Sequence, residues 1–341
     1  MYQLRYDDSI KRLVIFLTYR CNFNCSYCYV KKRKTKELSS KELIKIIDKL
    51  KKKNSKLKEI NFMGGEPLLR FDTIKKIVSN YKNKFEYNLN TNGSLLNDDI
   101  LNFLSKNRVI ITLSLDGSEK THNKNRKNKT FDKIVDRIRN YKDKVIINYV
   151  VNNDSTDKLI KDFDNLVKLG FKKIDIRPNS DYLWKKEEFK KLNKEILKFY
   201  MLYFNRYAGQ GIKIILDKMV TEKCFYLNEK GCQEVKISPE GYFFSCCRLC
   251  NTYRSKGLNF GKNRLDSKKR KNFLNFARKK INKYRIEKCK DCILDKYCLC
   301  MIDSFYLDKK NFSRWLDTFC KINKIMIGNL LRAKYHTLRK F

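Results

Sequence analysis

Short apolar runs alternate with amphipathic stretches along the first half of the chain. The runs are rich in β-branched and aromatic residues, which predicts strands. They lie at 13–18, 59–64, 85–90, 109–115, 144–151 and 173–178. Most segments between them place apolar residues at helical spacing, as in LIKIIDKLKK and FDKIVDRIRNY. Six β-α repeats predict an α/β fold with a parallel, curved or barrel-like sheet, whose function lies at the carboxyl ends of the strands.

The pattern changes in the second half of the chain. A helix rich in Leu, Phe and Tyr is expected at about 184–207, and loops with short β runs follow it. We expect a basic helix near 267–281 and a last helix near 317–337. Ten of the thirteen cysteines lie between Cys224 and Cys320. The second half is therefore expected to form a cysteine-rich unit of its own.

The chain is strongly basic, with 78 Lys and Arg against 37 Asp and Glu and a formal net charge of +41. Such a surplus is compatible with nucleic acid or an acidic partner. However, the lysines of segments such as 31–53 alternate with an apolar helical stripe, which is typical of solvated helix faces. We favour this interpretation over nucleic-acid binding, and an acidic peptide partner is compatible with either.

The start of the chain carries an apolar run from Leu13 to Leu17. This run is too short for the apolar region of a signal peptide and far too short to span a membrane. We interpret it as a buried strand and expect a soluble, cytoplasmic protein without a membrane partner. Clustered cysteines in a reducing compartment indicate metal binding rather than disulfides.

Three cysteines follow the first strand directly, as Cys21, Cys25 and Cys28. Thiolates at this spacing can bind three irons of a [4Fe–4S] cubane and leave the fourth iron open. The open iron can chelate the amine and carboxylate of a small molecule and pass it an electron. A zinc loop is the alternative, but zinc needs a fourth ligand and no further Cys or His is close in sequence.

The second strand ends in Met63, Gly64, Gly65, Glu66 and Pro67. Two glycines allow the backbone to approach a ligand closely, and the Glu66 carboxylate can accept from an ammonium group. Alone, this segment would read as an ordinary turn.

The two motifs together, each at the end of its own strand, resemble the radical S-adenosylmethionine (SAM) superfamily. The resemblance implies a partial (β/α)6 barrel over residues 1–207, with a [4Fe–4S] cluster on Cys21, Cys25 and Cys28. It implies reductive cleavage of SAM to a 5′-deoxyadenosyl radical that abstracts hydrogen from the substrate, with electrons from a donor such as flavodoxin or ferredoxin. The cofactor carries this chemistry, and the protein orients it and excludes water.

The same resemblance assigns cofactor contacts at later strand ends. Ser114 is the candidate for a ribose contact and Arg126 for the methionyl carboxylate, while Tyr27 is expected near the adenine. For each, a turn residue, a surface arginine or a core aromatic is the alternative. The full expected set is Tyr27, Gly64, Gly65, Glu66, Pro67, Asn92, Ser114, Arg126, Asn152 and Arg177.

Residues 208–341 resemble the SPASM-type domain, a cysteine-rich α+β unit that holds auxiliary iron–sulfur clusters. Gly241 to Cys246 supplies a GxxxxC element, and the segment 289–298 supplies CxxCxxxxxC. The ligand assignment of the family implies two clusters. Carried over, the inner cluster is held by Cys224, Cys232, Cys246 and Cys300, and the outer one by Cys289, Cys292, Cys298 and Cys320.

This second half departs from the family pattern in two places. One residue separates Cys298 from Cys300 where the family usually has three, and the stretch between Cys232 and Gly241 is a residue short. These departures affect the inner ligand set most, and zinc or buried thiols are the alternatives.

Two cysteines, Cys247 and Cys250, are not assigned as ligands of either cluster. Cys247, beside a predicted ligand, is our candidate catalytic residue as a hydrogen-atom donor. Replacing a ligand or filling space are its alternatives.

Relatives with this domain arrangement mostly modify peptides or protein side chains by crosslinking, epimerisation or oxidation. We therefore expect a peptide or protein substrate, with a ribosomally made peptide first, although we do not expect a separate leader-binding domain to fit ahead of the strand at residue 13. Sulfatase maturation and small-molecule dehydrogenation are the alternatives within the class. Outside it, the alternative is a non-catalytic zinc or iron–sulfur module that binds RNA.

Overall fold

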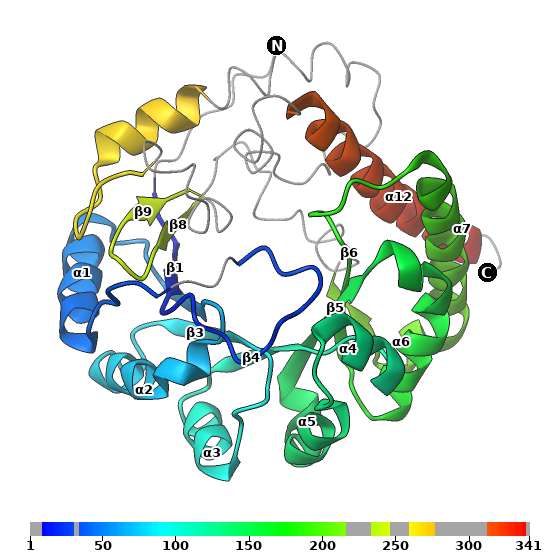
Figure 1. The fold of residues 1–341 in the computed structure, drawn as a ribbon, viewed down its shortest axis with the longest axis horizontal. Coiled ribbons are helices and arrows are strands. Elements are labelled where there is room, and N and C mark those ends of the chain that lie inside the picture. The colour runs from blue at the N-terminus through cyan, green and yellow to red at the C-terminus, as the bar shows by residue number, and fades with distance from the viewer. Residues whose placement is uncertain (1–8, 31–33, 216–232, 246–258, 277–311, 339–341) are drawn as a thin grey trace.

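The computed structural model describes residues 9–30, 34–215, 233–245, 259–276 and 312–338. Within these residues, nine strands form one sheet in the order β7-β6-β5-β4-β3-β2-β1-β8-β9. Neighbouring strands from β7 to β8 pair in parallel. Figure 1 shows the helices arranged outside this curved sheet. The expected α/β fold with a parallel, barrel-like sheet is confirmed.

The first six strands lie where the apolar runs predicted them, with ends that differ by one or two residues. They are β1 (Arg12–Phe16), β2 (Glu59–Met63), β3 (Glu86–Thr91), β4 (Ile110–Ser114), β5 (Val145–Val151) and β6 (Lys173–Pro178). Alternate side chains face opposite sides of a strand. On β2, Ile60 and Phe62 are fully buried in the main core, while Asn61 and Met63 line the interior cavity.

The connecting segments form helices that cover the outer face of the sheet. The α-helices are α1 (Ser40–Lys53), α2 (Phe71–Asn80), α3 (Asp98–Lys106), α4 (Glu119–Arg126), α5 (Phe131–Arg137) and α6 (Leu159–Lys168). Short 3₁₀ turns are η1 (Pro67–Arg70), η2 (Arg139–Lys144) and η3 (Asn153–Lys158). In α1, Ser39 and Glu42 form a capping box, which satisfies backbone donors at the helix start.

Beyond β6 the chain continues the same sheet. Helix α7 (Lys186–Leu202) runs into a π-turn, η4 (Tyr203–Tyr207), and a 3₁₀ turn, η5 (Ala208–Gln210). Strand β7 (Lys213–Ile214) then pairs with β6, β8 (Glu234–Ile237) pairs in parallel with β1, and β9 (Phe243–Phe244) pairs antiparallel with β8. The sheet thus crosses the domain boundary expected after residue 207, and that boundary stays a prediction.

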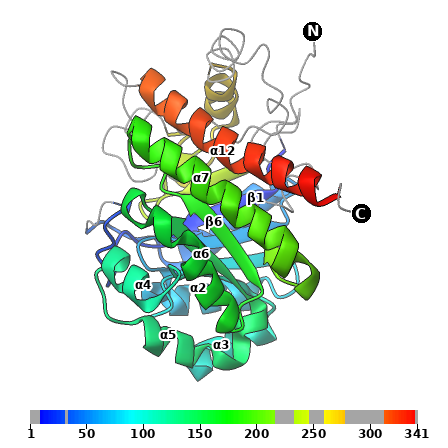
Figure 2. The same cartoon turned by 90° about the vertical axis from the view of Figure 1, so that its right-hand side faces the viewer.

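The C-terminal helix α12 (Phe312–Leu338) packs along α7, as Figures 1 and 2 both show. The side-chain Nδ2 of Asn329 donates to the main-chain carbonyl oxygen of Asn193 at 3.2 Å and to the Asn193 Oδ1 at 2.9 Å. The described part of the expected basic helix is helical over 267–276. No helix in the part of the chain that the structure describes is long and apolar enough to cross a membrane.

Candidate functional site

A cavity of about 640 Å³ lies inside the barrel and extends from the first residues of β1 to β4 to the loops at the carboxyl ends of the strands. Cys21, Cys25 and Cys28 of the loop after β1 all line it. Seven residues of the expected cofactor set line it too, namely Tyr27, Gly64, Gly65, Asn92, Ser114, Arg126 and Arg177. The other three, Glu66, Pro67 and Asn152, are not among its described lining residues. The structure therefore brings most of the expected residues to one place.

The cysteine loop is fixed to the barrel by its own side chains and backbone. Phe23 is buried in the main core, and both the amide N and Oγ of Ser26 donate to the carbonyl of Asn125, at 2.8 and 3.1 Å. The Nδ2 of Asn92 lies 3.8 Å from the sulfur of Cys21 and can donate to it. Donors to a ligating sulfur are typical of iron–sulfur sites, where they tune the cluster's potential.

The donor set of this loop fits an iron–sulfur cluster. Burial raises the pKa of the Cys25 thiol to about 11, and the nearby Arg126 guanidinium acts in the opposite direction. A cationic metal centre would therefore be needed to hold the Cys25 sulfur as a thiolate. Among the described residues, no three Cys, His, Asp or Glu side chains converge on one metal ion. A cubane does not require such convergence, because each of its cysteines binds a different iron.

Gly64 and Gly65 meet protein backbone rather than open space. A Cβ on Gly64, whose φ is +156°, would lie 2.6 Å from the carbonyl oxygen of Thr18, and one on Gly65 would lie 2.2 Å from that of Arg20. The amides of Gly65 and Glu66 donate to these same two carbonyls at 2.8 Å. The glycines are thus needed to pack the end of β2 against the segment that leads to Cys21.

Glu66 is fully buried and turned into the protein. Its Oε1 accepts from the Leu68 amide at 3.0 Å and from the Thr91 hydroxyl at 2.7 Å, and its Oε2 accepts from the Asn92 amide at 2.8 Å. Burial raises the pKa of this carboxyl to about 7, against the opposing effect of these three donors. The side chain therefore joins the loops after β2 and β3, and a direct contact with SAM stays a prediction.

We expect Glu66→Gln to change how stability depends on pH. The pKa of about 7 in the folded protein lies above that of an unfolded Glu, so folding binds a proton between those two values. The free energy of unfolding then falls by up to about 3 kcal/mol as the pH rises from about 4.5 to about 7. Gln does not titrate, so the variant lacks this contribution.

Anaerobic urea denaturation of both proteins near pH ~5 and ~8 measures this difference. The wild type should lose more stability than the variant between the two values. An equal loss in both proteins would show that Glu66 does not take up a proton on folding.

Asp116 lies at the centre of a buried polar network that the sequence analysis did not single out. Its Oδ1 accepts from Arg126 Nη2 at 2.9 Å and from the Val150 amide at 3.1 Å. Its Oδ2 accepts from the Tyr27 hydroxyl at 2.6 Å, and Asp116 itself is fully buried. The available signal was a carboxylate two residues after the fourth strand and directly before Gly117, whereas the family resemblance pointed to Ser114.

Arg126 is held between this carboxylate and an aromatic ring. Its guanidinium lies 5.5 Å from the centre of the Tyr27 ring, and its Nε is buried without a partner among the described residues. The Asp116 carboxylate keeps the pKa of Arg126 above its usual value. The neighbouring His122 accepts from the Asp116 amide at 3.3 Å, and burial lowers its pKa to about 3, so it is neutral. Arg126 is thus a fixed cation in the cavity wall, suited to an anionic group.

The last two expected contacts make hydrogen bonds within the protein. Asn152 donates from Nδ2 to Asn125 Oδ1 at 3.1 Å and accepts from Asn179 Nδ2 at 2.9 Å. Arg177 lines the cavity, and its Nε donates to Asp175 Oδ2 at 2.7 Å. Their contact with the cofactor is not tested by the structure and stays a prediction.

Most cysteines of the second half lie outside the described residues. These are Cys224, Cys232, Cys246, Cys289, Cys292, Cys298 and Cys300, together with Cys247 and Cys250. Cys320 lies on α12 and is half-buried. Gly241, which opens the GxxxxC element, has a φ of +93°, and a Cβ there would lie 2.1 Å from Asn263 Oδ1. The auxiliary clusters and their ligands therefore stay predictions.

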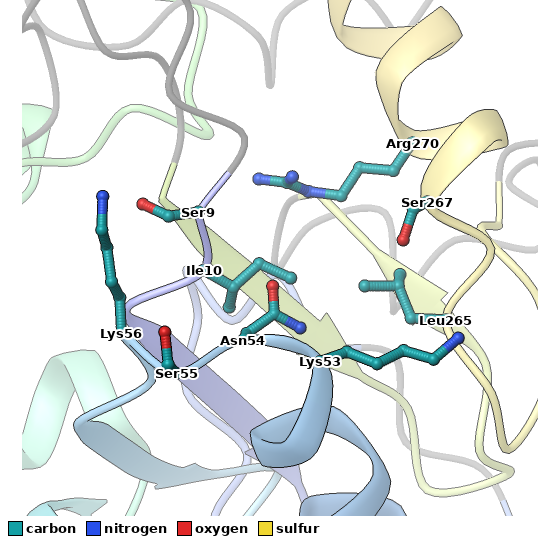
Figure 3. A pocket seen from close by; sticks show the side chains of 9 residues that line it. All are labelled: Ser9, Ile10, Lys53, Asn54, Ser55, Lys56, Leu265, Ser267 and Arg270. Atoms are coloured by element: carbon teal, nitrogen blue, oxygen red, sulfur yellow. The ribbon is translucent and has the colours of Figure 1, made fainter.

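A second hollow, of about 330 Å³, lies at the amino ends of β1 and β2. The segments 9–10 and 53–56 and residues near the start of helix 267–276 line it, and Figure 3 shows Arg270 reaching across it toward Ser9. Three cations and no carboxylate are among the described residues that line this hollow. Catalysis in parallel barrels takes place at the carboxyl ends of the strands, so we do not assign this hollow to the catalytic site.

Residues 15–174 match the family model of the radical SAM superfamily. This match begins within β1 and ends in β6, and it includes the three cysteines that line the cavity. The chain belongs to the radical SAM superfamily. As a radical SAM enzyme it uses a [4Fe–4S] cluster and SAM, and the cysteine loop that is predicted to hold the cluster lines the cavity.

Three relatives illustrate the range of the family. The uncharacterised protein MJ0907 of Methanocaldococcus jannaschii is 32% identical over 65% of this chain and 80% of that protein. The radical SAM cyclopropyl synthase TigE of Paramaledivibacter caminithermalis is 32% identical over 34% of this chain and 29% of its own length. A cysteine-type anaerobic sulfatase-maturating enzyme of Clostridium perfringens is 26% identical over 66% of this chain and 71% of that enzyme.

A solved structure extends the similarity to nearly the whole chain. The structure of native anSMEcpe with bound AdoMet and Cp18Cys peptide matches 95% of this chain and 99% of that chain with a TM-score of 0.73. The two sequences are 20% identical over the match. The likeness therefore shows that the two chains share a fold.

Proposed function

We propose that this radical SAM enzyme abstracts a hydrogen atom from a peptide or protein substrate. The observation that carries the proposal is the single cavity that joins the cysteine loop to a buried cation and a polar barrel wall. One end can hold the cluster and SAM, and the remaining wall can receive a substrate group. The solved neighbour with bound peptide and the sulfatase-maturating relative support this substrate class.

Each part of the cavity has a proposed role. Cys21, Cys25 and Cys28 would hold the cluster, which supplies one electron for the reductive cleavage of SAM when bound. Arg126, with its unpartnered Nε, would bind the carboxylate of SAM, because a charge-assisted hydrogen bond suits that pair. Ser114 would contact the ribose, and the Tyr27 hydroxyl, committed to Asp116, keeps the ring in place beneath Arg126.

The second half of the chain would hold two auxiliary clusters. Its eight predicted ligands are Cys224, Cys232, Cys246, Cys300, Cys289, Cys292, Cys298 and Cys320. Such clusters can accept an electron from the substrate radical or bind the substrate. Maturation of a sulfatase, by oxidation of a side chain, is the second candidate function, and the sulfatase-maturating relative favours it.

Transfer of deuterium from a labelled peptide to 5′-deoxyadenosine tests the proposal. The enzyme is reconstituted anaerobically, reduced with dithionite, and incubated with SAM and perdeuterated peptide. The Cp18Cys peptide and the peptides encoded beside the gene serve as probes, and the product is analysed by mass spectrometry. We expect deuterium in 5′-deoxyadenosine and a matching mass change in one peptide. Unlabelled 5′-deoxyadenosine with every peptide would contradict a peptide substrate, and turnover of Cp18Cys would favour sulfatase maturation.

A further inference from the structure

Three strands turn asparagine side chains into the barrel interior. Asn61 on β2, Asn90 on β3 and Asn148 on β5 all line the cavity, and we call them the asparagine belt. The Oδ1 atom of each is buried and has no hydrogen-bond donor among the described residues. The interior of a parallel barrel is normally filled by bulky apolar side chains. The belt is a departure from that rule.

A neighbouring residue shows that the departure is specific. Asn88, two positions before Asn90 on β3, also lines the cavity, but its Oδ1 accepts from the Thr112 hydroxyl at 3.2 Å. Buried polar groups in native proteins are nearly always hydrogen-bonded, and those that are not mark a functional site or an unseen partner. The unpaired Oδ1 atoms of the belt therefore indicate that another molecule supplies their hydrogen-bond donors, because the described residues do not.

The charged and neutral side chains of the cavity wall indicate which chemical class of ligand the belt can bind. Two arginines that also line the cavity form ion pairs: Arg12 with Glu59 and Glu234, and Arg177 with Asp175. The belt itself presents neutral amides. Each amide offers an acceptor oxygen and an NH₂ donor, which is the complement of a peptide unit. A free carboxylate or phosphate could use only the NH₂ donors of these amides, because it has no hydrogen to donate to their oxygens.

The belt runs along the barrel wall from its middle toward its carboxyl end. Asn61 lies in the middle of β2, and Asn90 is the last residue but one of β3. Asn148 lies in the middle of β5 and pairs in register with Ser114, the proposed ribose contact. A peptide held on the belt would therefore lead toward the proposed SAM site.

We infer that the asparagine belt binds main-chain amide groups of the substrate, and so holds a stretch of peptide backbone inside the barrel. The inference rests on the proposed function and adds which part of the substrate the barrel recognises. In this arrangement the belt binds the neutral backbone of the peptide rather than charged side chains. The substrate residue that reacts would then lie at the carboxyl end of the cavity, beside SAM.

A triple variant, Asn61→Leu, Asn90→Leu and Asn148→Leu, tests the inference. Leu has the same number and branching of side-chain heavy atoms as Asn and removes both the donor and the orphan acceptor; it is the larger residue, and the Asn88→Leu control adds the same bulk to the same cavity wall. The probe is the blocked dipeptide N-acetyl-Ala-Ala-amide, which is neutral and carries only peptide amides and methyl groups. Its binding to the reconstituted, reduced enzyme is measured by the paramagnetic broadening of its methyl proton signals.

We expect the variant to bind the probe about tenfold to a hundredfold more weakly than the wild type, since up to three hydrogen bonds are lost. Its iron content should be unchanged, because none of the three asparagines is a predicted cluster ligand. Its melting temperature should be equal or higher, because unsatisfied polar groups have been removed. The matched control, Asn88→Leu, should keep probe binding and lower the melting temperature, because it removes the acceptor of Thr112.

Each other outcome overturns the inference. A lower melting temperature of the triple variant would show that the belt is structural, satisfied by internal water. A lower iron content would place the belt in the cluster site. Unchanged probe binding, or no binding to the wild type, would show that the barrel does not recognise peptide backbone. The deuterium-transfer experiment decides the peptide substrate independently of all three.

Discussion

Replacing Cys21, Cys25 and Cys28 together by Ala is expected to abolish cleavage of SAM. These residues supply all the thiolates of the loop after β1, and they are the cysteines that line the cavity in the described part of the chain. Without them the cluster that delivers the electron has no ligands. Anaerobic assay of 5′-deoxyadenosine by chromatography measures the loss, which should reach the background of the assay.

The same variant reports on the second half of the chain. With three [4Fe–4S] clusters the wild type should hold about twelve irons, and the variant about eight. Retention of about four would mean that the inner auxiliary site is not built from Cys224, Cys232, Cys246 and Cys300. Asn24→Ala, an exposed position in the same loop, is the control and should change neither quantity. SAM cleavage by the triple variant near the wild-type rate would refute the assignment of the first cluster.

The strands of the barrel and the cysteine loop could be predicted because each is determined by residues that are close together in the sequence. A strand such as β5 alternates buried and half-buried residues along its whole length, so its period is visible without knowledge of its neighbours. The three cysteines likewise lie within a segment of eight residues, 21–28. Their position after the first strand was enough to place the site, because parallel strands gather their carboxyl ends at one edge.

The pairing of β8 with β1 could not be predicted in the same way. Strand β8 has four residues, and its partner lies more than two hundred positions away in sequence. Nothing in a run of that length identifies which strand it will meet. The consequence is that a strand beyond residue 207 extends the barrel sheet, although the composition changes near that point.

The orientation of single side chains was the other limit. The contact of Glu66 with SAM stays a prediction, whereas its hydrogen bonds to three donors, from Leu68, Thr91 and Asn92, could not be predicted. Which way a carboxylate points depends on donors that other segments bring, and those donors are known only after folding. The role of Asp116 was missed for the same reason, since its partners come from three separate segments: the loop after β1, helix α4 and strand β5.

Asp116→Asn is expected to be the most destabilising single substitution near the site. Asp116 and Arg126 form an ion pair of 2.9 Å whose side chains are 0% and 5% exposed. Asn keeps the shape and an acceptor for the Val150 amide, but it leaves the Arg126 charge buried without its counter-ion. Breaking one side of a buried pair typically costs about 3–5 kcal/mol. Urea denaturation of the anaerobic holoprotein measures the loss in free energy of unfolding.

An exposed pair on the same helix provides the matched control. Lys124 on α4 pairs with Asp154 at 2.7 Å, and the two side chains are 54% and 47% exposed. Asp154→Asn should cost under about 1 kcal/mol, because solvent already screens that pair. Adding Arg126→Gln to Asp116→Asn should recover part of the loss, since the uncompensated charge is removed. If Asp116→Asn costs no more than Asp154→Asn, then Arg126 finds its counter-charge elsewhere, and the carboxylate is not what fixes this cation in the cavity wall.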